Sequence, residues 1–171
     1  MLANLSTRRG FAARLAAFFS GAGIAAMTTS AAAEAQASSG VQKLDYTGKP
    51  AGTGFITPLI IHNGVIYIAG QGAHSHDNGE TFPMDIENHT KHVMESVKLL
   101  VETGGGAMDS ILQLTVFLTN IDNYDGMNKV FKTYFPNGGP ARTTVAVAAL
   151  PGNSLVEINC TAAVVRGGKK G

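Results

Sequence analysis

The stretch "GPARTTVAVAALPGNSLVEINCTAAVV" (residues 139–165) is almost wholly small or apolar, yet it carries two opposite charges. Arg142 stands near its head and Glu157 lies inside its second half. The apolar and β-branched runs at 143–150 and 155–165, separated by the turn residues "PGNS", predict two strands. Charges in a segment that reads as core need a partner or a function, so both residues are candidates for a special role.

Side chains of a strand alternate between its two faces, and this alternation divides the last strand. Val156, Ile158 and Cys160 share a core-like face, whereas Glu157 shares the other face with Asn159, Thr161 and their neighbours. Across a turn, the beginning of one strand lies near the end of its neighbour. The sequence therefore does not force Arg142 against Glu157, and a plain ion pair between them stays open.

The first half of the domain reads as strands followed by a helix. Residues 41–48 predict a short strand, and 55–70 predict two strand runs around the tight-turn pair Asn63-Gly64. Residues 84–106 have apolar residues at helical spacing, with Asp85 as the expected cap and Gly104 to Gly106 at the end.

A strand at 110–120 and a second helix at 121–136 complete the pattern, with Asp122 as the expected helix cap and Pro136 as its stop. The order is then β, β, β, α, β, α, β, β. This order predicts an α+β fold with one mixed sheet and both helices on one face. The second face of such a sheet must be exposed to solvent or buried against another subunit.

Residues 1–37 do not read as part of the domain. Arg8 and Arg9 precede a long, weakly apolar run, and small-residue A-x-A sites follow at 33–37, which is the layout of an export signal. The stretch "TRRGF" resembles the twin-arginine signature, so Tat or Sec export is expected, with a periplasmic or secreted domain at 38–171 and no stable membrane association. An Ala-rich amphipathic or organelle-targeting helix is the alternative.

Removal of this leader changes the charge balance. The chain has 13 Lys and Arg and 12 Asp and Glu, and without Arg8, Arg9, Arg14 and Glu34 it keeps 10 and 11. No basic face remains to attract nucleic acid, so no nucleic-acid partner is expected. The single cysteine, Cys160, cannot form an internal disulfide, so the fold must rest on packing.

The stretch "PARTTVAVAALPGNSLVEINCTAAV" resembles the signature of the RidA/YjgF family of enamine/imine deaminases. "NGVIYIAGQ" (63–71) resembles the family's second strand pair, and residues 79–135 resemble its helix, central strand and second helix. The resemblance covers roughly residues 41–166.

The resemblance implies a chorismate-mutase-like fold that assembles as a homotrimer, with the sheets as an inner barrel and the sites between subunits. It implies that Arg142 binds the carboxylate of a 2-imino or enamine acid through two parallel hydrogen bonds. It implies that Glu157 positions and activates the water that replaces ammonia, which leaves a 2-keto acid. Neither a metal nor another cofactor is implied.

The same resemblance places other residues at the substrate site. Asn128, Thr144 and Gly70 match family positions at the cleft. Phe55 stands where many members have tyrosine, and Ala69 where many have serine. Phe55 has no hydroxyl to offer. Tyr67 shares a strand face with Ala69, and either it supplies the missing hydroxyl or it is a half-buried tyrosine of the sheet.

Two alternatives remain open. The protein is either a deaminase or a non-catalytic trimer that binds small carboxylates or acts as a chaperone. The histidines at 74, 76, 89 and 92, with Asp77, have metal-ligating side chains, but without a thiolate partner we interpret them as loop and surface residues. Cys160 lies on the core-like face and is expected to be a buried apolar residue, not a nucleophile.

Overall fold

The computed structural model describes residues 40–74 and 83–165. The expected leader at 1–37 lies outside the described residues, as do His76 and Asp77. Within the described ranges, no helix is long and apolar enough to cross a membrane.

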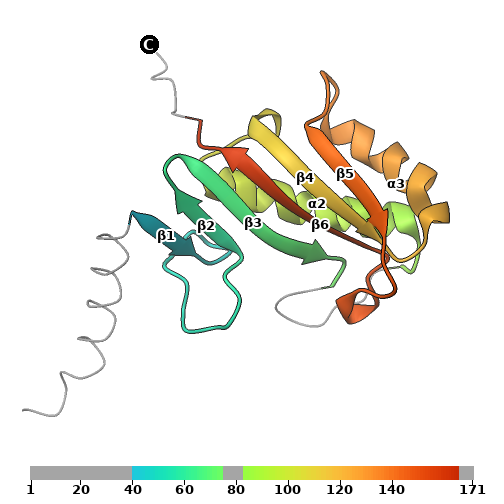
Figure 1. Ribbon diagram of the computed structural model, residues 1–171, viewed down its shortest axis with the longest axis horizontal. Helices are drawn as coiled ribbons and strands as arrows, with labels where there is room; N and C mark the ends of the chain where they lie inside the picture. The colour runs from blue at the N-terminus through green and yellow to red at the C-terminus, as the bar shows by residue number, and fades with distance from the viewer. Residues whose placement is uncertain (1–39, 75–82, 166–171) are drawn as a thin grey trace, which may run out of the picture.

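The strands and helices follow one another in the predicted order (Figure 1). They are β1 (Val41–Leu44), β2 (Leu59–His62), β3 (Val65–Gly72), α2 (Ile86–Thr103), β4 (Ile111–Leu118), α3 (Tyr124–Phe131), β5 (Ala141–Ala146) and β6 (Val156–Ala163). Short 3-10 turns occupy Met108–Ser110, Ile121–Asn123, Lys132–Tyr134 and Pro151–Asn153.

The strands form one mixed sheet in the order β1-β2-β3-β6-β4-β5. Strand β4 pairs with β5 in parallel, and all other pairs are antiparallel. The last strand therefore inserts between β3 and β4, although β5 precedes it in sequence. The expectation that β5 and β6 are neighbours across the "PGNS" turn is wrong, because β6 satisfies its backbone hydrogen bonds with β3 and β4.

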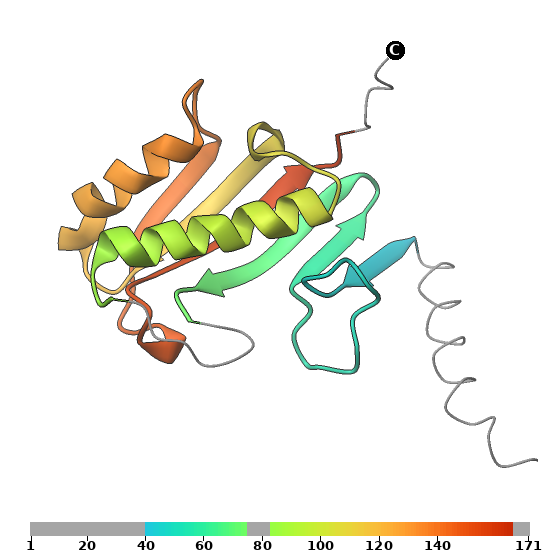
Figure 2. The ribbon, with the colours of Figure 1, turned by 180° about the vertical axis from the view of Figure 1, so that it is seen from behind.

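Both helices cover one face of the sheet, which confirms the predicted α+β architecture (Figures 1 and 2). The buried face of α2 supplies Val93, Met94, Val97, Leu100 and Val101 to the core. The helix-covered face of the sheet meets them with fully buried side chains, among them Leu114, Val116, Ile158 and Ala162. No described element covers the other face of the sheet, which we call the open face.

Helix α2 begins and ends where its sequence predicts. The carboxylate of Asp85 accepts a hydrogen bond from the backbone N–H of Asn88 at 2.9 Å. This bond satisfies a donor that the first helical turn leaves without a partner, and it lowers the pKa of Asp85. The helix closes at Gly104, and Gly105 follows with a φ of +80°, a left-handed conformation that favours glycine.

The second helical segment differs from the prediction in its beginning. Its first turn, Ile121–Asn123, is a 3-10 turn, and the side chain of Asn120 caps it by accepting from the N–H of Asp122 at 3.0 Å. The prediction of Asp122 as the cap is wrong, because the turn starts at Ile121 and its cap must precede it. The predicted tight turn is confirmed, since Asn63 and Gly64 both have positive φ between β2 and β3.

Candidate functional site

Arg142 lies on the helix-covered face of the edge strand β5. The strand begins at Ala141, two residues earlier than the sequence pattern suggests, so Arg142 is inside the ladder. Its partner in the parallel pairing is Leu114 of β4, which is fully buried beneath the helices. Partners in a ladder share a face, so the guanidinium points towards α3.

Helix α3 holds the guanidinium of Arg142 with three of its side chains. Nη1 donates to Oδ1 of Asn128 at 2.8 Å, and Nη2 donates to the hydroxyl of Tyr124 at 3.2 Å. The guanidinium also lies over the Phe131 ring, 4.7 Å from its centroid, and 5.7 Å from that of Tyr124. Asn128 was expected near this arginine. Tyr124 and Phe131 were missed, although their spacing from Asn128 (i−4 and i+3) places all three on one helix face.

No carboxylate of the described residues pairs with Arg142. Lys129, on the same helix as Asn128, forms an ion pair with Glu87 at 2.8 Å. The partners of Arg142 are a neutral amide, a neutral hydroxyl and aromatic rings. A guanidinium carries five N–H donors, and side chains in the described part of the chain accept from two of these. The site can therefore accept an anion, and a planar carboxylate fits the remaining donors.

Thr144 follows Arg142 by two residues on the same face of β5 and pairs with the buried Val116. Its hydroxyl oxygen is buried and has no hydrogen-bond partner among the described residues. A buried hydroxyl without a partner costs free energy, so a ligand or water beside Arg142 would relieve that cost.

Glu157 lies on the open face of the sheet, as its alternation with buried neighbours predicts. It pairs with Phe117 of β4 and Gly72 of β3. A Cβ on Gly70 would clash with the carboxylate of Glu157, so the position of Glu157 depends on glycine at residue 70. Gly70 and Ala69 lie in a bulge of β3, where the register with β6 shifts between Ile68 and Gln71.

The buried side chain of Gln71 holds this bulge in shape. Its amide Nε2 donates to the carbonyl oxygens of Ala69 at 2.9 Å and of Gly70 at 3.2 Å. Its Oε1 accepts a hydrogen bond from the hydroxyl of Tyr46 at 3.3 Å. The residues around Gln71 carry no sequence signal of this role, because the role depends on a register shift that only the paired sheet reveals.

Arg142 and Glu157 lie on opposite faces of the sheet. Strand β4 lies between β5 and β6 in the sheet. Arg142 pairs with Leu114 of β4, and Glu157 pairs with Phe117, three residues further along the same strand, so their Cα atoms lie roughly 14 Å apart. The plain ion pair between them within one chain is therefore excluded. A reaction that needs both side chains at one substrate requires them from two copies of the chain.

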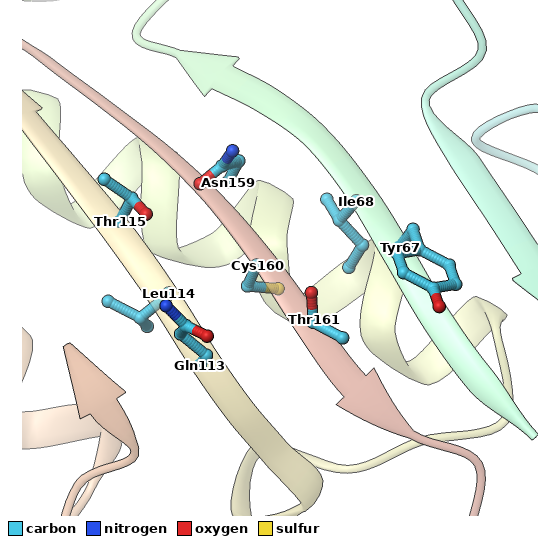
Figure 3. A pocket seen from close by; sticks show the side chains of 8 residues that line it. All are labelled: Tyr67, Ile68, Gln113, Leu114, Thr115, Asn159, Cys160 and Thr161. Atoms are coloured by element: carbon cyan, nitrogen blue, oxygen red, sulfur yellow. The ribbon is translucent and has the colours of Figure 1, made fainter. Parts of the chain in front are cut away.

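The other expected site residues are spread over the open side. Tyr67 is 47% exposed on the open face, and Phe55 is 99% exposed in the connection between β1 and β2. A hollow of about 260 Å³ lies across β3, β6 and β4. Its lining includes Tyr67, Gln113, Thr115, Asn159 and Thr161, which Figure 3 shows on these three strands. Neither Arg142 nor Glu157 lines this hollow, so it is distinct from their surroundings.

The structure also shows the surroundings of the candidate metal-ligating histidines and of the cysteine. The interpretation of His89 as a surface residue is wrong, because it is 1% exposed and its Nδ1 accepts the N–H of Leu155 at 3.0 Å. Among the described residues, no group of three metal-ligating side chains comes together. Cys160 is buried as expected, and burial raises the pKa of its thiol to about 12, which suppresses the reactive thiolate.

Comparisons with known proteins agree with this architecture. The family model described as endoribonuclease L-PSP matches residues 47–164. A RutC family protein of Pyrococcus abyssi is 34% identical over 97 residues, which cover 57% of this chain and 76% of that protein.

Two solved structures extend the comparison. A protein of the Rid family from Yersinia pestis has a TM-score of 0.65 at 34% identity, covering 72% of this chain and 99% of its own. TdcF of E. coli, solved with bound serine, has a TM-score of 0.63 at 26% identity, covering 71% and 98%. Because the family model spans most of the chain and the fold matches these structures, the protein belongs to the endoribonuclease L-PSP family, that is, the RidA/YjgF family.

Proposed function

We propose that the protein hydrolyses 2-imino acids and their enamine tautomers to 2-keto acids and ammonia. The observation that carries this proposal is the guanidinium of Arg142, which is held by Asn128 and Tyr124 and has no carboxylate partner among the described residues. A guanidinium that is held in place and keeps free N–H donors is preorganised to bind a small carboxylate. The serine in the structure of TdcF, an amino acid with a carboxylate, supports a ligand of this class.

In the proposed reaction, Arg142 binds the carboxylate and orients the protonated imine. The oxygen of a water molecule bonds to the imine carbon, while Glu157 accepts a proton from that water. Glu157 returns that proton to the nitrogen, the C–N bond breaks, and ammonia leaves as the carbonyl forms. Glu157 accepts the proton of the new hydroxyl in this step, and the proton then passes to ammonia, which departs as ammonium. Proton transfer by one positioned carboxylate typically contributes about 10²–10⁴-fold to such a rate.

We propose that the active form is a homotrimer with a site between each pair of neighbouring copies. The opposite placement of Arg142 and Glu157 supports this assembly, since one copy cannot bring both to a single substrate. The open face also exposes Tyr67, and Val145 is 40% exposed on the edge strand β5. A face with large exposed apolar groups is suited to burial against another copy.

The alternative is a trimer of the same fold that binds small carboxylates without turning them over. Phe55 favours this alternative, since it offers no hydroxyl and lies almost fully exposed, 99% of its surface being accessible. The two functions differ in their need for Glu157, because carboxylate binding requires Arg142 but hydrolysis also requires the base.

A trapping assay tests the proposal. An amino-acid oxidase with catalase generates imino acids from a panel of amino acids, and semicarbazide traps whatever is not hydrolysed. The wild type is expected to lower the semicarbazone yield. Arg142→Lys keeps the charge but loses the planar fork, and should lower kcat/KM about tenfold to a hundredfold.

Glu157→Gln should abolish turnover while binding of pyruvate survives, and Glu102→Gln, an exposed carboxylate on α2, is the matched control. Wild-type protein that fails to lower the semicarbazone yield across the panel would contradict the deaminase proposal. Incubation with single-stranded RNA belongs in the same series, because the family description names an endoribonuclease. RNA cleavage without imine hydrolysis would favour that activity.

We also propose that residues 1–37 direct export, which would place the domain in the periplasm or outside the cell. The motivating observation is the pair Arg8 and Arg9 ahead of a weakly apolar run and A-x-A sites. Fusion of residues 1–40 to a reporter tests it. Export that is lost in an Arg8→Lys/Arg9→Lys variant supports a twin-arginine route, and a reporter retained in the cytoplasm overturns the proposal.

A further inference from the structure

The carboxylate of Glu157 is placed by packing and not by hydrogen bonds within its own chain. No group of the described residues forms a hydrogen bond or an ion pair with this carboxylate. It lies instead against the backbone of Gly70, so closely that a Cβ at residue 70 would clash with it. The backbone of Gly70 therefore decides where the proposed base lies.

The strand ladder does not hold Gly70. The register of β3 with β6 shifts between Ile68 and Gln71, so neither Ala69 nor Gly70 has a partner on β6. The pairing of β3 with β2 ends at Ile68, and the N–H of Ala69 donates to the carbonyl oxygen of Pro58 at 3.0 Å. Residues in a bulge fall outside the regular ladder, so Gly70 needs other contacts to keep one conformation.

Gln71 supplies these contacts from the covered face. It pairs with Ile158, which is fully buried on that face, and it is itself 1% exposed. Its Nε2 donates to the carbonyl oxygens of Ala69 at 2.9 Å and of Gly70 at 3.2 Å, which draws both oxygens towards the covered face. These partly negative oxygens are thus kept away from the Glu157 carboxylate, which lies on the open face.

Tyr46 fixes the direction of the Gln71 amide. Its hydroxyl donates to Oε1 of Gln71 at 3.3 Å, so that Nε2 is turned to the two carbonyl groups. A flipped amide would place Oε1, an acceptor, against two carbonyl oxygens that are also acceptors. Tyr46 follows β1 in the chain, so this contact ties the first strand to the bulge.

We propose that Gln71, supported by Tyr46, is a positioning residue for Glu157. The amide fixes the backbone of the bulge, and the backbone of the bulge fixes the carboxylate. This inference rests on the role of Glu157 as the base in the proposed function. Gln71 is buried on the opposite face and acts through Gly70, so it affects the rate of the chemical step and not the binding of a carboxylate by Arg142.

The substitution Gln71→Met tests the proposal, because it keeps the length of the side chain but removes both donors. A misplacement of about 1 Å can cost roughly a hundredfold in rate, so kcat of imine hydrolysis should fall about ten- to a hundredfold. Binding of pyruvate, measured by calorimetry on the full chain, should stay as in the wild type. Tyr46→Phe, a milder change that removes one hydroxyl, should lower kcat about twofold to tenfold. A wild-type kcat in both variants would overturn the proposal.

The matched control is Ser110→Ala. Ser110 is also buried, and its hydroxyl donates to the carbonyl oxygen of Ala163 at 2.8 Å, at the opposite end of β6 from Glu157. The control loses a buried hydrogen bond to the sheet without a change near Gly70, so it should keep the wild-type kcat. An equal loss of kcat in Ser110→Ala and Gln71→Met would mean that any such bond has this effect, which overturns the positioning role.

A second readout does not depend on activity. Glutamates labelled with ¹³C at the carboxyl carbon are observed by NMR, and the signal of Glu157 is assigned by its absence in Glu157→Gln. In Gln71→Met this signal should shift, because the carboxylate changes its surroundings, whereas the signals of the glutamates on α2 should not. An unmoved Glu157 signal in Gln71→Met would overturn the proposal, whatever the rate.

The failure of this inference and the failure of the proposed function are distinguishable. A wild type without imine hydrolysis removes the deaminase, and a Glu157 signal that still shifts in Gln71→Met then keeps the placement of the carboxylate by Gln71. A wild type that hydrolyses imines, with a Gln71→Met variant that loses pyruvate binding as strongly as kcat, overturns the positioning role and leaves the deaminase intact.

Discussion

The two faces of the sheet carry different kinds of side chain, although the same strands supply both. On the helix-covered face, Leu114, Val116 and Ile158 are at most 1% exposed and pack beneath the helices. On the open face, side chains of the same strands, such as Thr115 and Asn159, are polar and at least partly exposed. Arg142 belongs to the first face and Glu157 to the second. The covered face therefore holds the fold, and the proposed site takes one residue from each face.

The first prediction sets a change on the covered face against a matched change at the surface. Leu114→Ala should destabilise the protein by about 3 kcal/mol, because it leaves a cavity in a well-packed core. Leu99→Ala, on the outer side of α2 where the leucine is 50% exposed, should cost less than about 1 kcal/mol. Denaturant unfolding measures both. Equal losses would contradict the division between a packed face and an open one.

The second prediction concerns the close approach of Gly70 and Glu157. Gly70→Ala places a Cβ where the Glu157 carboxylate lies, so the carboxylate must move. The strain is expected to lower kcat/KM by about ten- to a hundredfold, with overpacking typically costing about 1–3 kcal/mol. Gly52→Ala, at a position with open space around the added methyl group, is the control. Full imine hydrolysis by Gly70→Ala would show that the position of Glu157 is not critical.

The third prediction separates folding from assembly. Asn159→Lys puts a positive charge on the open face, where a trimer would gather three copies of it. The variant should stay folded by circular dichroism, as surface changes usually alter stability by less than about 0.5 kcal/mol, but should sediment as a monomer. Asn137→Lys, the same change in an exposed turn, should leave the assembly intact. An unchanged trimer with Asn159→Lys would place the subunit interface elsewhere.

The fourth and smallest effect concerns Cys160. Burial raises the pKa of its thiol to about 12, so the thiolate fraction near neutral pH is far below that of a free cysteine. A thiol reagent at about pH 8 should leave the native protein unlabelled and label the unfolded chain quickly. Labelling of the native protein at the rate of the unfolded chain would contradict the assignment of Cys160 to the covered face.

Local patterns were sufficient to predict much of the fold. The alternation along β6 placed Glu157 opposite the core, the pair Asn63-Gly64 marked the turn, and Asp85 marked the start of α2. Each of these features depends on neighbours within a few residues. The order of the elements also followed from local periods, and that order favoured the mixed sheet with its helices on one face.

The features that sequence could not predict depend on contacts between distant segments. The insertion of β6 between β3 and β4 is a long-range pairing that no local pattern encodes. The sequence also does not show on which face of β5 Arg142 lies, because this strand has small residues on both faces and no clear alternation of apolar and polar residues. His89 fits a helix surface or a core equally well until the N–H of Leu155 is placed against it.

The most direct test of the account asks whether Arg142 and Glu157 of different copies share a site. Arg142→Ala and Glu157→Gln, each inactive alone, are mixed as unfolded chains in equal amounts and refolded together. If each site takes its arginine from one copy and its glutamate from the next, about a quarter of the sites in a random trimer have both, so about a quarter of wild-type imine hydrolysis should return. No recovery, in mixed trimers verified by mass spectrometry, would mean that one copy supplies both residues, and would contradict the account.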